Sequence, residues 1–449
     1  MLGPMRTALL LASVVGLLLA GIALGAAGCL GAKEFHCASN DQCIQASAQG
    51  TCGPAGFCAF DDGDCESGQR YGELSGPFSN QCVPTPDAPN PDAPDAPPDM
   101  AIDSPPSSDA RECFGTGAYE LCFTDMPPTG SISLAGTLDT DTDTRCVPMP
   151  ASWTAAGQPD ACMIAANTIM VTGNLAVTGS AARRPLVLVG ETITISATID
   201  VASHRSPAVD AIGAPATQCA AFPTQPVNAT AGAGGGAGGS FMRAGGNGGT
   251  GDTAAITGGT APPADSTAPT ILRAGCAGQE GGTGTGAPGA PGNGGGAIYV
   301  AANALSFGTA GIINASGSSA NGPAGGTNAG GSGGGSGGMV VLYSAVAIQA
   351  NGARVVANGG GGSAGADGGN AGNPGNDPVP TTPTSPPTGG SGAGGNGGAG
   401  FAGTTNAASG QNANGSKETG GGGGGGGGYL QSNQPLTGAV TSPAVTIVP

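Results

Sequence analysis

Reactive side chains are rare in this sequence, and one short stretch brings a carboxylate, an imidazole and a guanidinium together. Its residues are Asp200, His204, Arg205 and Asp210, with Arg183 and Arg184 preceding them. Carboxylate oxygens are the ligands that Ca²⁺ prefers, and a side chain held beside a sugar acid can take up its proton. These carboxylates are too few for a calcium cage. We therefore expect ordinary turn residues here and assign no catalytic residue.

Three further patterns are similar to motifs that carry chemistry, and each lacks an essential part. The aspartates of DTDTDT at 139–144 have the first spacings of a calcium loop, but Thr144 stands where glycine is needed. The glycine run near Lys417 is not followed by the Lys-Ser or Lys-Thr of a phosphate loop. Ser203 and His204 are adjacent, so they do not form a nucleophile pair by themselves. The sequence predicts a solvated turn at 139–144, no metal site and no cofactor.

The charge balance argues against a nucleic-acid partner. The chain has 12 Lys+Arg against 29 Asp+Glu, a formal net charge of -17 at pH 7, and would be repelled by phosphates. Only 9% of the residues are charged and 4% are aromatic, whereas 90 are glycine. This composition is far from that of ordinary globular domains, so we expect no nucleic-acid binding and no conventional enzyme core.

The first residues have the pattern of an export signal. Arg6 supplies a positive start, an apolar stretch covers 9–24, and small residues at 25–28 precede Cys29. The apolar stretch is short and rich in Gly and Ala, which favours a cleaved signal over a permanent membrane helix. We predict a signal peptide at 1–28.

Ala26-Ala27-Gly28-Cys29 resembles a bacterial lipobox, in which the cysteine becomes the lipidated first residue of the mature protein. Ala26 stands where Leu, Val or Ile is usual, so ordinary cleavage among the small residues is the alternative. We expect Cys29 to carry the lipid and residues 29–36 to form a tether. The membrane, reached through this lipid, is then one partner.

The remaining cysteines are expected to pair. Removing Cys29 from 13 cysteines leaves 12, an even number that fits an oxidising compartment. Residues 37–83 predict a disulfide-rich module, because so short a segment has little apolar surface to bury. Its pairing stays open, and a zinc site is the alternative. The twelve candidates are Cys37, Cys43, Cys52, Cys58, Cys65, Cys82, Cys113, Cys122, Cys146, Cys162, Cys219 and Cys276.

Six of these cysteines lie beyond the module. Cys219 and Cys276 bracket the first glycine-rich tract, and we expect them to close it. The other four would staple the first strands of the repeat, although Cys162 is also a candidate for a free buried thiol. Between the module and these cysteines, residues 84–110 are rich in Pro and Asp. Proline fixes φ and like charges repel, so this segment predicts an extended linker.

A repeat of about 24 residues is visible after the linker. Residues 186–195 align without a gap on 298–307, and 162–171 match the same template. Further copies begin at Val340 and cover 132–138. Each copy alternates aliphatic residues in short stretches that are broken at Gly, Asn or Thr. One copy cannot bury its apolar stripe alone, so the repeat predicts an all-β fold over 111–449, a right-handed parallel β-helix.

Glycine-rich tracts interrupt the repeat. They are residues 231–250, 278–296, 322–338, 359–375, 389–400 and the nine glycines at 420–428. We expect long loops that project from the corners of the solenoid. Two states are open: flexible, solvated loops, which we favour because glycine loses the most entropy on ordering, or packed polyproline-II layers bonded to one another.

The chain resembles glycine-rich surface lipoproteins of Gram-negative soil bacteria that are PE-PGRS-like in composition. The resemblance rests on Cys29, the cysteines of 37–82, the Pro-Asp linker, residues 184–205 and the terminal TSPAVTIVP. It covers nearly the whole chain, but the mycobacterial PE module is absent. The resemblance implies the β fold and the surface location, and it carries over no catalytic residue.

We therefore expect a structural or adhesive lipoprotein of the bacterial envelope, exported to the outer membrane or cell surface, that is not an enzyme. An envelope or extracellular polysaccharide is the expected second partner. The alternative is a carbohydrate-active β-helix that is similar to pectate lyases and binds or cleaves an acidic polysaccharide. In that case Asp200 and Arg205 are the residues to test.

Overall fold

The computed structural model describes residues 35, 37, 39–45, 48–52, 57–65, 67–75, 78–83, 112–123, 128–213, 218–413 and 418–448. The expected signal peptide, Cys29 and the linker at 84–110 lie outside the described residues. The chain divides into two compact units, Met1–Ser104 and Pro105–Pro449, and each is described by itself. Among the described residues, no helix has the length and apolar character needed to span a bilayer.

The first unit is a small set of antiparallel strands around disulfides. A 3-10 turn, η1 (Asn40–Gln42), precedes the hairpin of β1 (Ile44–Gln45) and β2 (Ala48–Gln49), and a three-stranded sheet joins β3 (Thr51–Cys52), β4 (Cys58–Asp61) and β5 (Gln69–Tyr71). The disulfides are Cys37–Cys52, Cys43–Cys58 and Cys65–Cys82. They replace most of a hydrophobic core, since the buried side chains are few and half of them are cysteines.

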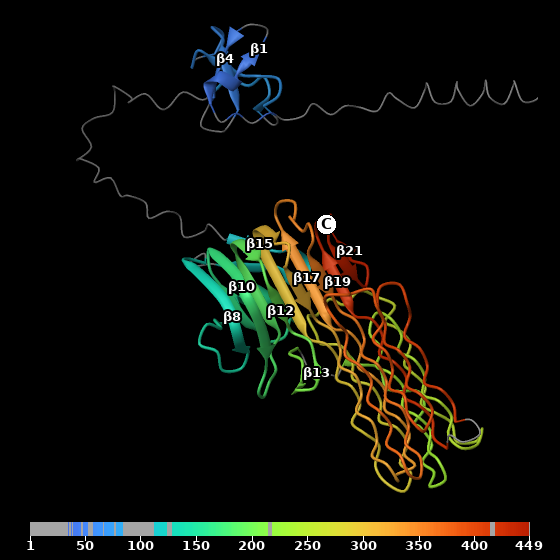
Figure 1. The fold of residues 1–449 in the computed structure, drawn as a ribbon. Coiled ribbons are helices and arrows are strands. Elements are labelled where there is room, and N and C mark those ends of the chain that lie inside the picture. Colours follow the sequence, from blue (N-terminus) through green and yellow to red (C-terminus); the bar gives the residue numbers. More distant parts are fainter. Residues whose placement is uncertain are drawn as a thin grey trace, which may run out of the picture. The chain divides into compact units, whose positions relative to one another are not determined.

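The second unit is built on one large parallel sheet that curls into a half-barrel (Figure 1). Its strands are β8 (Ser131–Asp139), β9 (Cys162–Ala165), β10 (Thr168–Thr178), β11 (Leu186–Ile195), β12 (Thr198–Asp200), β15 (Ala297–Phe307), β16 (Ile312–Asn314), β17 (Met339–Ser344), β18 (Arg354–Val356), β19 (Tyr429–Ser432), β20 (Val440–Ser442) and β21 (Thr446–Ile447). All the strand pairs in this sheet are parallel. The expected all-β, parallel arrangement is confirmed at this level.

The strand register follows the sequence repeat. Cys162 pairs with Leu186 and Ile169 with Ile193, each 24 positions further along. Leu186 then pairs with Ile298, in the alignment that the sequence predicted. Successive copies therefore stack directly on one another, because a shift by one residue would turn every aliphatic side chain to the other face.

Alternate side chains of the first strands are buried on both faces of the sheet. Leu186 and Leu188 belong to an aliphatic cluster inside the curl, whereas Val187 and Val189 belong to a second cluster on the outer face. Burial on both faces explains why the sequence reads as a continuous aliphatic run. Each fully buried aliphatic side chain contributes about 1.5–3 kcal/mol.

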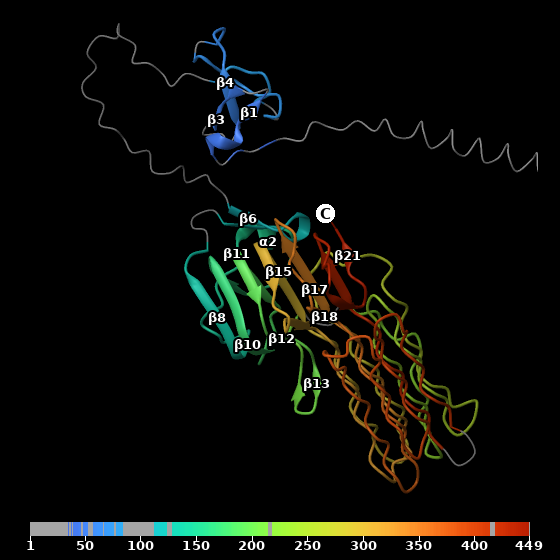
Figure 2. The ribbon, with the colours of Figure 1, turned by 45° about the horizontal axis from the view of Figure 1, so that its top comes forward.

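The outer cluster is covered by segments on either side of β8. They contain β6 (Glu112–Phe114), η3 (Gly117–Tyr119), β7 (Leu121–Phe123) and α2 (Ala151–Ala155), and Figure 2 shows β6 and α2 beside β11 and β15. The Trp153 ring stacks on Tyr299 with centroids 6.0 Å apart. The indole N–H of Trp153 donates to Pro159 O at 2.7 Å, so this polar group is satisfied although the ring is buried.

The glycine-rich tracts leave the sheet at one corner. The chain makes a long excursion after β12, after β16 and after β18, and returns each time at the first strand of the next layer, which is β15, β17 or β19. Figures 1 and 2 show these excursions as extended segments that lie side by side. Because stacked layers are about 4.8 Å apart, excursions from the same corner begin as close neighbours.

The excursions form a hydrogen-bonded glycine bundle, so the expectation of flexible, solvated loops is wrong. The strand at 420–428 is buried at every residue. Its N–H groups donate in turn to three neighbouring strands: Gly420, Gly423 and Gly426 to 233–239, Gly421 and Gly424 to 408–411, and Gly422, Gly425 and Gly428 to 357–363. A rotation that repeats every three residues is the geometry of polyproline II.

The carbonyl groups of the same strand complete the packing. Gly331, Gly334 and Gly337 donate to Gly420, Gly423 and Gly426, and residues of 243–249 and 395–401 donate to the other carbonyls. Six strands therefore surround the glycine run. The entropy that glycine loses on ordering is offset by about one backbone hydrogen bond per residue in a buried site, where leaving the group unpaired would cost about 1–3 kcal/mol.

The same close approach explains why the run consists of glycine alone. A Cβ on Gly424 would lie 1.9 Å from Ala399 O, and one on Gly422 would lie 1.9 Å from Ser332 O. Outer strands face solvent once per turn, and side chains return at that spacing: Ala274, Ala277 and Glu280 are partly or fully exposed, whereas Gly275 and Gly278 between them are buried. The number of neighbours of a strand thus sets its glycine content.

Candidate functional site

The polar residues singled out in the sequence lie where the sheet meets the glycine bundle. Asp200 ends β12 between the buried Ile199 and Val201, with its side chain on the other face of the strand. Its Oδ2 lies 3.0 Å from Nε2 of His204, and its Oδ1 accepts a hydrogen bond of 3.0 Å from Nδ2 of Asn314 on the next layer. Both carboxylate oxygens are therefore engaged within the protein.

His204 begins a short hairpin, β13 (His204–Arg205) with β14 (Ala208–Val209). The hydrogen bond to Asp200 raises the pKa of the His204 imidazole, and the negative charges of Asp200 and Asp377 act in the same direction against partial burial. A carboxylate that holds the imidazolium is an ion pair, so this contact is strongest when His204 is protonated.

Asp377 ties the hairpin to the bundle. Its Oδ2 accepts from the Arg205 backbone N–H at 2.9 Å, and its Oδ1 accepts from both the N–H and the hydroxyl of Ser319 at 2.7 Å each. The Arg205 Nε also donates to the Ser319 hydroxyl at 3.2 Å. Three segments far apart in sequence, at 200–205, 314–319 and 377, are thereby joined by charged hydrogen bonds, which we call the junction clamp.

Ser203 belongs to the clamp as well, but its hydroxyl is committed. It is 1% exposed, donates to Gly294 O at 2.6 Å and accepts from Ala211 N–H at 3.0 Å. The hydroxyl therefore joins β12 to the glycine strand that leads into β15. A hydroxyl held in this way has no hydrogen bond from His204 and lacks the base that a nucleophile requires.

The two upstream arginines are held elsewhere. Arg183 pairs with Asp210, which also accepts from the amide of Asn293. Arg184 lies 3.7 Å from Asp141, whose carboxylate accepts from the backbone N–H groups of Ala181 and Arg183 at 2.6 and 3.0 Å. The six residues of the original stretch thus form three separate groups, and Asp200 and Arg205 do not converge on one open site.

The pair Arg183–Asp210 borders a polar pocket of about 290 Å³. Small side chains and glycines line the rest of it, including Ala274, Ala277 and Gly294. The pocket is shallow, and the charges beside it neutralise each other. Among the candidate residues, the pair that borders this pocket is the most accessible to solvent, since the Arg183 side chain is 47% exposed.

The DTDTDT turn departs in part from the solvated turn that was expected. Asp143 forms an ion pair with Arg145 at 2.6 Å, and Asp139 accepts from the N–H of Asp141. The Asp141 side chain is only 9% exposed. Backbone N–H groups from 181–184 hold the pKa of Asp141 below its usual value, against the opposing effect of burial. The three carboxylates point to different partners, so they do not share one cation.

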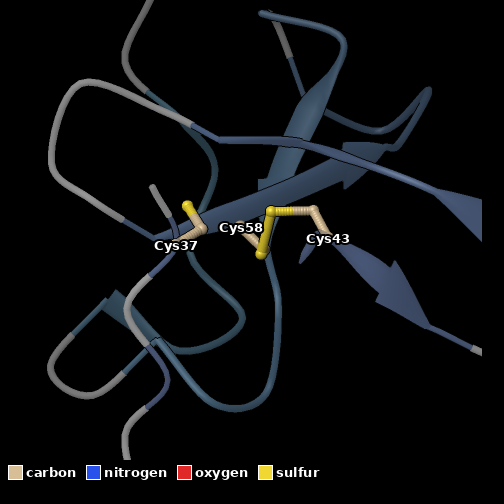
Figure 3. Close-up of side chains that lie close together, drawn as sticks. All are labelled: Cys37, Cys43 and Cys58. Atoms are coloured by element: carbon tan, nitrogen blue, oxygen red, sulfur yellow. A yellow bond between two sulfur atoms is a disulfide. The ribbon is translucent and has the colours of Figure 1, made fainter. Parts of the chain in front are cut away.

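Three cysteine sulfurs of the first unit lie close together, as Figure 3 shows for Cys37, Cys43 and Cys58. Cys43 is bonded to Cys58 and Cys37 to Cys52. A metal such as zinc needs the thiolate form, which a cystine does not offer. His36, the one histidine next to these cysteines in the sequence, lies outside the described residues. This arrangement therefore favours the disulfide interpretation over a zinc site.

The other cysteines are also placed in pairs. Cys113 is joined to Cys122 across β6 and β7, and Cys146 to Cys162, so Cys162 is not a free thiol. Cys219 is joined to Cys276, which closes the first glycine excursion. Glu120 lies beside the Cys113–Cys122 pair, but the same argument from thiolate chemistry applies there.

The first unit also has an apolar concavity of about 350 Å³. Phe35, Ile44, Phe60 and Leu74 contribute to its lining, and the Phe35 N–H donates to Leu74 O at 2.9 Å. Ile44 is 67% exposed. No local motif marks this concavity, because its residues are far apart in the sequence and the disulfide-bonded turns bring them together.

No protein-family model, no characterised protein and no solved structure matches the chain. The junction clamp is therefore interpreted from its own geometry. Sequence reasoning found Asp200, His204 and Arg205 but missed Asn314, Ser319 and Asp377. These three come from segments whose contacts depend on how the glycine excursions pack, and no local motif marks them.

Proposed function

We propose that this protein is a structural or adhesive component of the bacterial cell surface, in which the glycine bundle is a rigid element displayed away from the membrane. The observation that carries the proposal is the glycine run at 420–428, bonded to six neighbouring strands. A bundle of this kind is held by backbone hydrogen bonds rather than by an aliphatic core. Such a construction suits a spacer or a display surface.

Export and lipid anchoring at Cys29 belong to the same proposal. Six disulfides support it, because such bonds persist in oxidising compartments outside the cytosol. The likeness in composition to PE-PGRS-like surface lipoproteins points the same way.

We further propose that the parallel sheet is part of a right-handed parallel β-helix. Three sets of parallel ladders support this. The first joins β9 to the first halves of β11 and β15 and continues to β17 and β19. The second joins the first halves of β8 and β10 to the second halves of β11 and β15, and the third joins the second halves of β8 and β10 to β12, β16, β18 and β20. Nearly all chain crossovers between parallel strands are right-handed. In this arrangement the junction clamp fixes the bundle to the third ladder.

A second candidate function is the binding of a polysaccharide, and one observation favours it. The pocket beside Arg183, Asp210 and Asn293 offers polar groups among small side chains, and hydroxyl-rich ligands use such groups. Asp200 and Arg205 are less suited, since both are engaged in the clamp. Glycan arrays probed with wild type and with Arg183→Ala and Asn293→Ala test this candidate. Binding that both variants retain would exclude this pocket.

The main proposal is tested on cells of the native host. We expect wild type to incorporate a labelled fatty acid and to be reached by protease or antibody on intact cells, whereas Cys29→Ser is exported without the label. Adhesion of cells that carry wild type is then compared with adhesion of cells that carry Gly424→Leu, which disrupts the bundle. A wild type that stays inside the cell, or surface-exposed protein whose disruption alters neither adhesion nor envelope integrity, would refute the proposal.

A further inference from the structure

The apolar concavity of the first unit lies on one face of its three-stranded sheet. Side chains alternate between the two faces of β4, so Phe60 and Ala59 point to opposite sides. Phe60 lines the concavity, whereas Ala59 belongs to the cluster with Phe57 and Tyr71. The Phe78 ring packs on these two aromatic rings, with centroids 5.8 and 5.5 Å away. One face of the sheet is therefore covered by aromatic rings, and the other has the concavity.

Exposed apolar side chains of the first unit gather around this concavity. Among the described residues of the unit, four large apolar side chains are exposed, and three of them line it: Phe35, Ile44 and Leu74. They are 42%, 67% and 49% exposed. Neighbouring apolar side chains that stay in contact with water around a hollow are typical of a surface that binds a partner.

The chain reaches the rim of the concavity directly from the proposed lipid anchor. Phe35 is the sixth residue after Cys29, and its N–H donates to Leu74 O at 2.9 Å, which fixes the chain at the rim. Six residues span at most about 20 Å when fully extended. With Cys29 in the membrane, the rim stays within this distance of the lipid. A weak affinity of the concavity for lipid would then act at a high effective concentration, whereas another protein would have to arrive by diffusion.

The charge of the module decides which kind of lipid contact is favourable. Residues 37–83 contain six acidic residues and one arginine, so anionic headgroups would repel the module. Glu73 is exposed and borders the concavity itself. Attraction to the membrane must therefore come from apolar burial, which a zwitterionic lipid surface permits without repulsion.

We propose that the concavity of the first unit docks on the zwitterionic lipid surface of the membrane that holds Cys29. Its exposed apolar side chains enter the boundary between headgroups and acyl chains, which lies about 5–10 Å deep for apolar faces of peripheral proteins. This inference rests on the proposed lipid anchor and adds a second contact to it. Two membrane signals hold a protein more stably than one, and the docked module has a fixed orientation, with the Phe78 face toward water.

Quenching of tryptophan by brominated lipid tests this orientation. The full lipidated chain is reconstituted into phosphatidylcholine vesicles whose acyl chains carry bromine, with unbrominated vesicles as the reference. The natural Trp153 is 1% exposed and gives a constant background. Ile44→Trp places a second tryptophan at the rim, and we expect at least about half of the added emission to be quenched at the depth of an interfacial contact. Phe78→Trp, on the opposite face, is the matched control and should keep its added emission.

Two changes test whether the contact is apolar. Leu74→Asp, introduced into the Ile44→Trp chain, places a carboxylate at the rim that must leave water, and is expected to lower the quenching at least about threefold. Replacing part of the phosphatidylcholine with anionic phosphatidylglycerol should not increase the quenching, because the module is acidic. Thermal unfolding verifies that each variant is folded, and the two tryptophan variants decide the test without Leu74→Asp.

Mass spectrometry of each chain separates this inference from the anchor on which it rests. A chain without lipid on Cys29 refutes the anchor, and the docking with it. A lipidated chain in which Ile44→Trp is quenched no more than Phe78→Trp overturns the docking and leaves the anchor intact. Quenching that rises with phosphatidylglycerol also overturns it, since headgroup charge would then hold the module.

Discussion

The parallel sheet and the glycine bundle bury their backbones in opposite ways. In the sheet, aliphatic side chains such as Leu188 and Ile298 fill the interior of the curl, and the strands pair in the plane around it. In the bundle, side chains are excluded and each central strand is enclosed by other backbones. The hydrophobic effect dominates the first region, and satisfied hydrogen bonds in close contact dominate the second.

This difference teaches which substitutions each region tolerates. The sheet is sensitive to losing volume, because an unfilled space forfeits contacts on all sides. The bundle is sensitive to gaining volume, because a new Cβ meets a carbonyl oxygen that is itself held by a hydrogen bond. Substitutions by a smaller side chain therefore destabilise the sheet, and substitutions by a larger side chain destabilise the bundle.

The largest effect is expected for Gly424→Leu. A Cβ at Gly424 already lies 1.9 Å from Ala399 O, and the strand cannot move without breaking bonds to 246 and 408. We expect the free energy of unfolding to decrease by about 5 kcal/mol or more, which is beyond the usual range for point substitutions. Thermal unfolding and hydrogen exchange of 231–250 and 389–413 measure it.

The matched control lies in the same bundle. Gly368 is exposed, and the nearest atom to an added Cβ is Asn328 Oδ1 at 3.7 Å. Gly368→Leu is expected to change stability by no more than about 0.5 kcal/mol. Slow exchange that survives unchanged in Gly424→Leu would contradict the packed bundle and return the tracts to solvated loops.

The next effect is expected for Leu188→Ala in the sheet. Leu188 is completely buried in the aliphatic cluster, and removing a buried leucine costs about 2–5 kcal/mol because the cavity collapses only in part. Met170→Ala on β10, where the side chain is 39% exposed, is the control and should cost less. Equal losses for the two variants would mean that the curl is not a packed core.

The sequence predicted the sheet better than the bundle for a physical reason. The stacking of Leu186 on Ile298 was readable because aliphatic side chains repeat in register and the core depends on them. The backbone hydrogen bonds of Gly424 to Ala408 and Gly246 produce no comparable sequence pattern. A glycine has no side chain whose type would indicate whether it is buried or exposed. The spacing of Ala274, Ala277 and Glu280 carries the period of three, as do the AGGNGG stretches at 244–249 and 393–398.

The sequence singled out only some residues of the junction clamp, for the same reason, and did not predict the clamp itself. Asp200, His204 and Arg205 are conspicuous in a chain with few charges. Asp377 and Ser319 are brought to them by the fold of the glycine excursions, which no local pattern encodes. The alternative interpretation of the stretch, as a carbohydrate-active site, requires an open site, but partners from the next layer and from the bundle engage Asp200 and Arg205.

A smaller effect is expected for Asp377→Asn, which weakens the link between the two regions. The substitution keeps the shape but removes the charge that accepts from Arg205 and Ser319. A hydrogen bond to a charged acceptor contributes about 1.5–3 kcal/mol, and partial exposure of Asp377 reduces this contribution. We therefore expect the free energy of unfolding to decrease by about 1 kcal/mol, measured by thermal unfolding.

The same variant has a second readout. The Asp377 charge contributes to the raised pKa of His204, so Asp377→Asn should lower that pKa in an NMR titration. Asp252→Asn, on an exposed turn of the bundle, is the control and should leave the titration unchanged. If the pKa of His204 is unaltered in Asp377→Asn, the charge of Asp377 does not act on the imidazole in the junction clamp.

The smallest effect is the pH dependence of the junction. Because its pKa is raised in the folded protein, His204 stabilises the fold fully below the ordinary histidine value of about 6.5, and this contribution is lost as pH rises through the folded pKa. Thermal unfolding midpoints of wild type should therefore decrease between pH 6 and pH 8 more than those of His204→Gln.

A second group changes in the same range and must be separated from the first. Burial and the neighbouring Glu191 raise the pKa of Glu112, on β6 over the outer face of the sheet, to about 7. A carboxyl whose pKa is raised on folding also destabilises the fold as it ionises, so both groups lower stability with rising pH. Glu112→Gln removes the pH dependence of stability that comes from Glu112. His204→Gln removes the pH dependence that comes from the junction. In Glu112→Gln, the remaining decrease of the unfolding midpoint with rising pH should come from His204. If adding His204→Gln leaves that decrease unchanged, the imidazole is not what holds the two regions together.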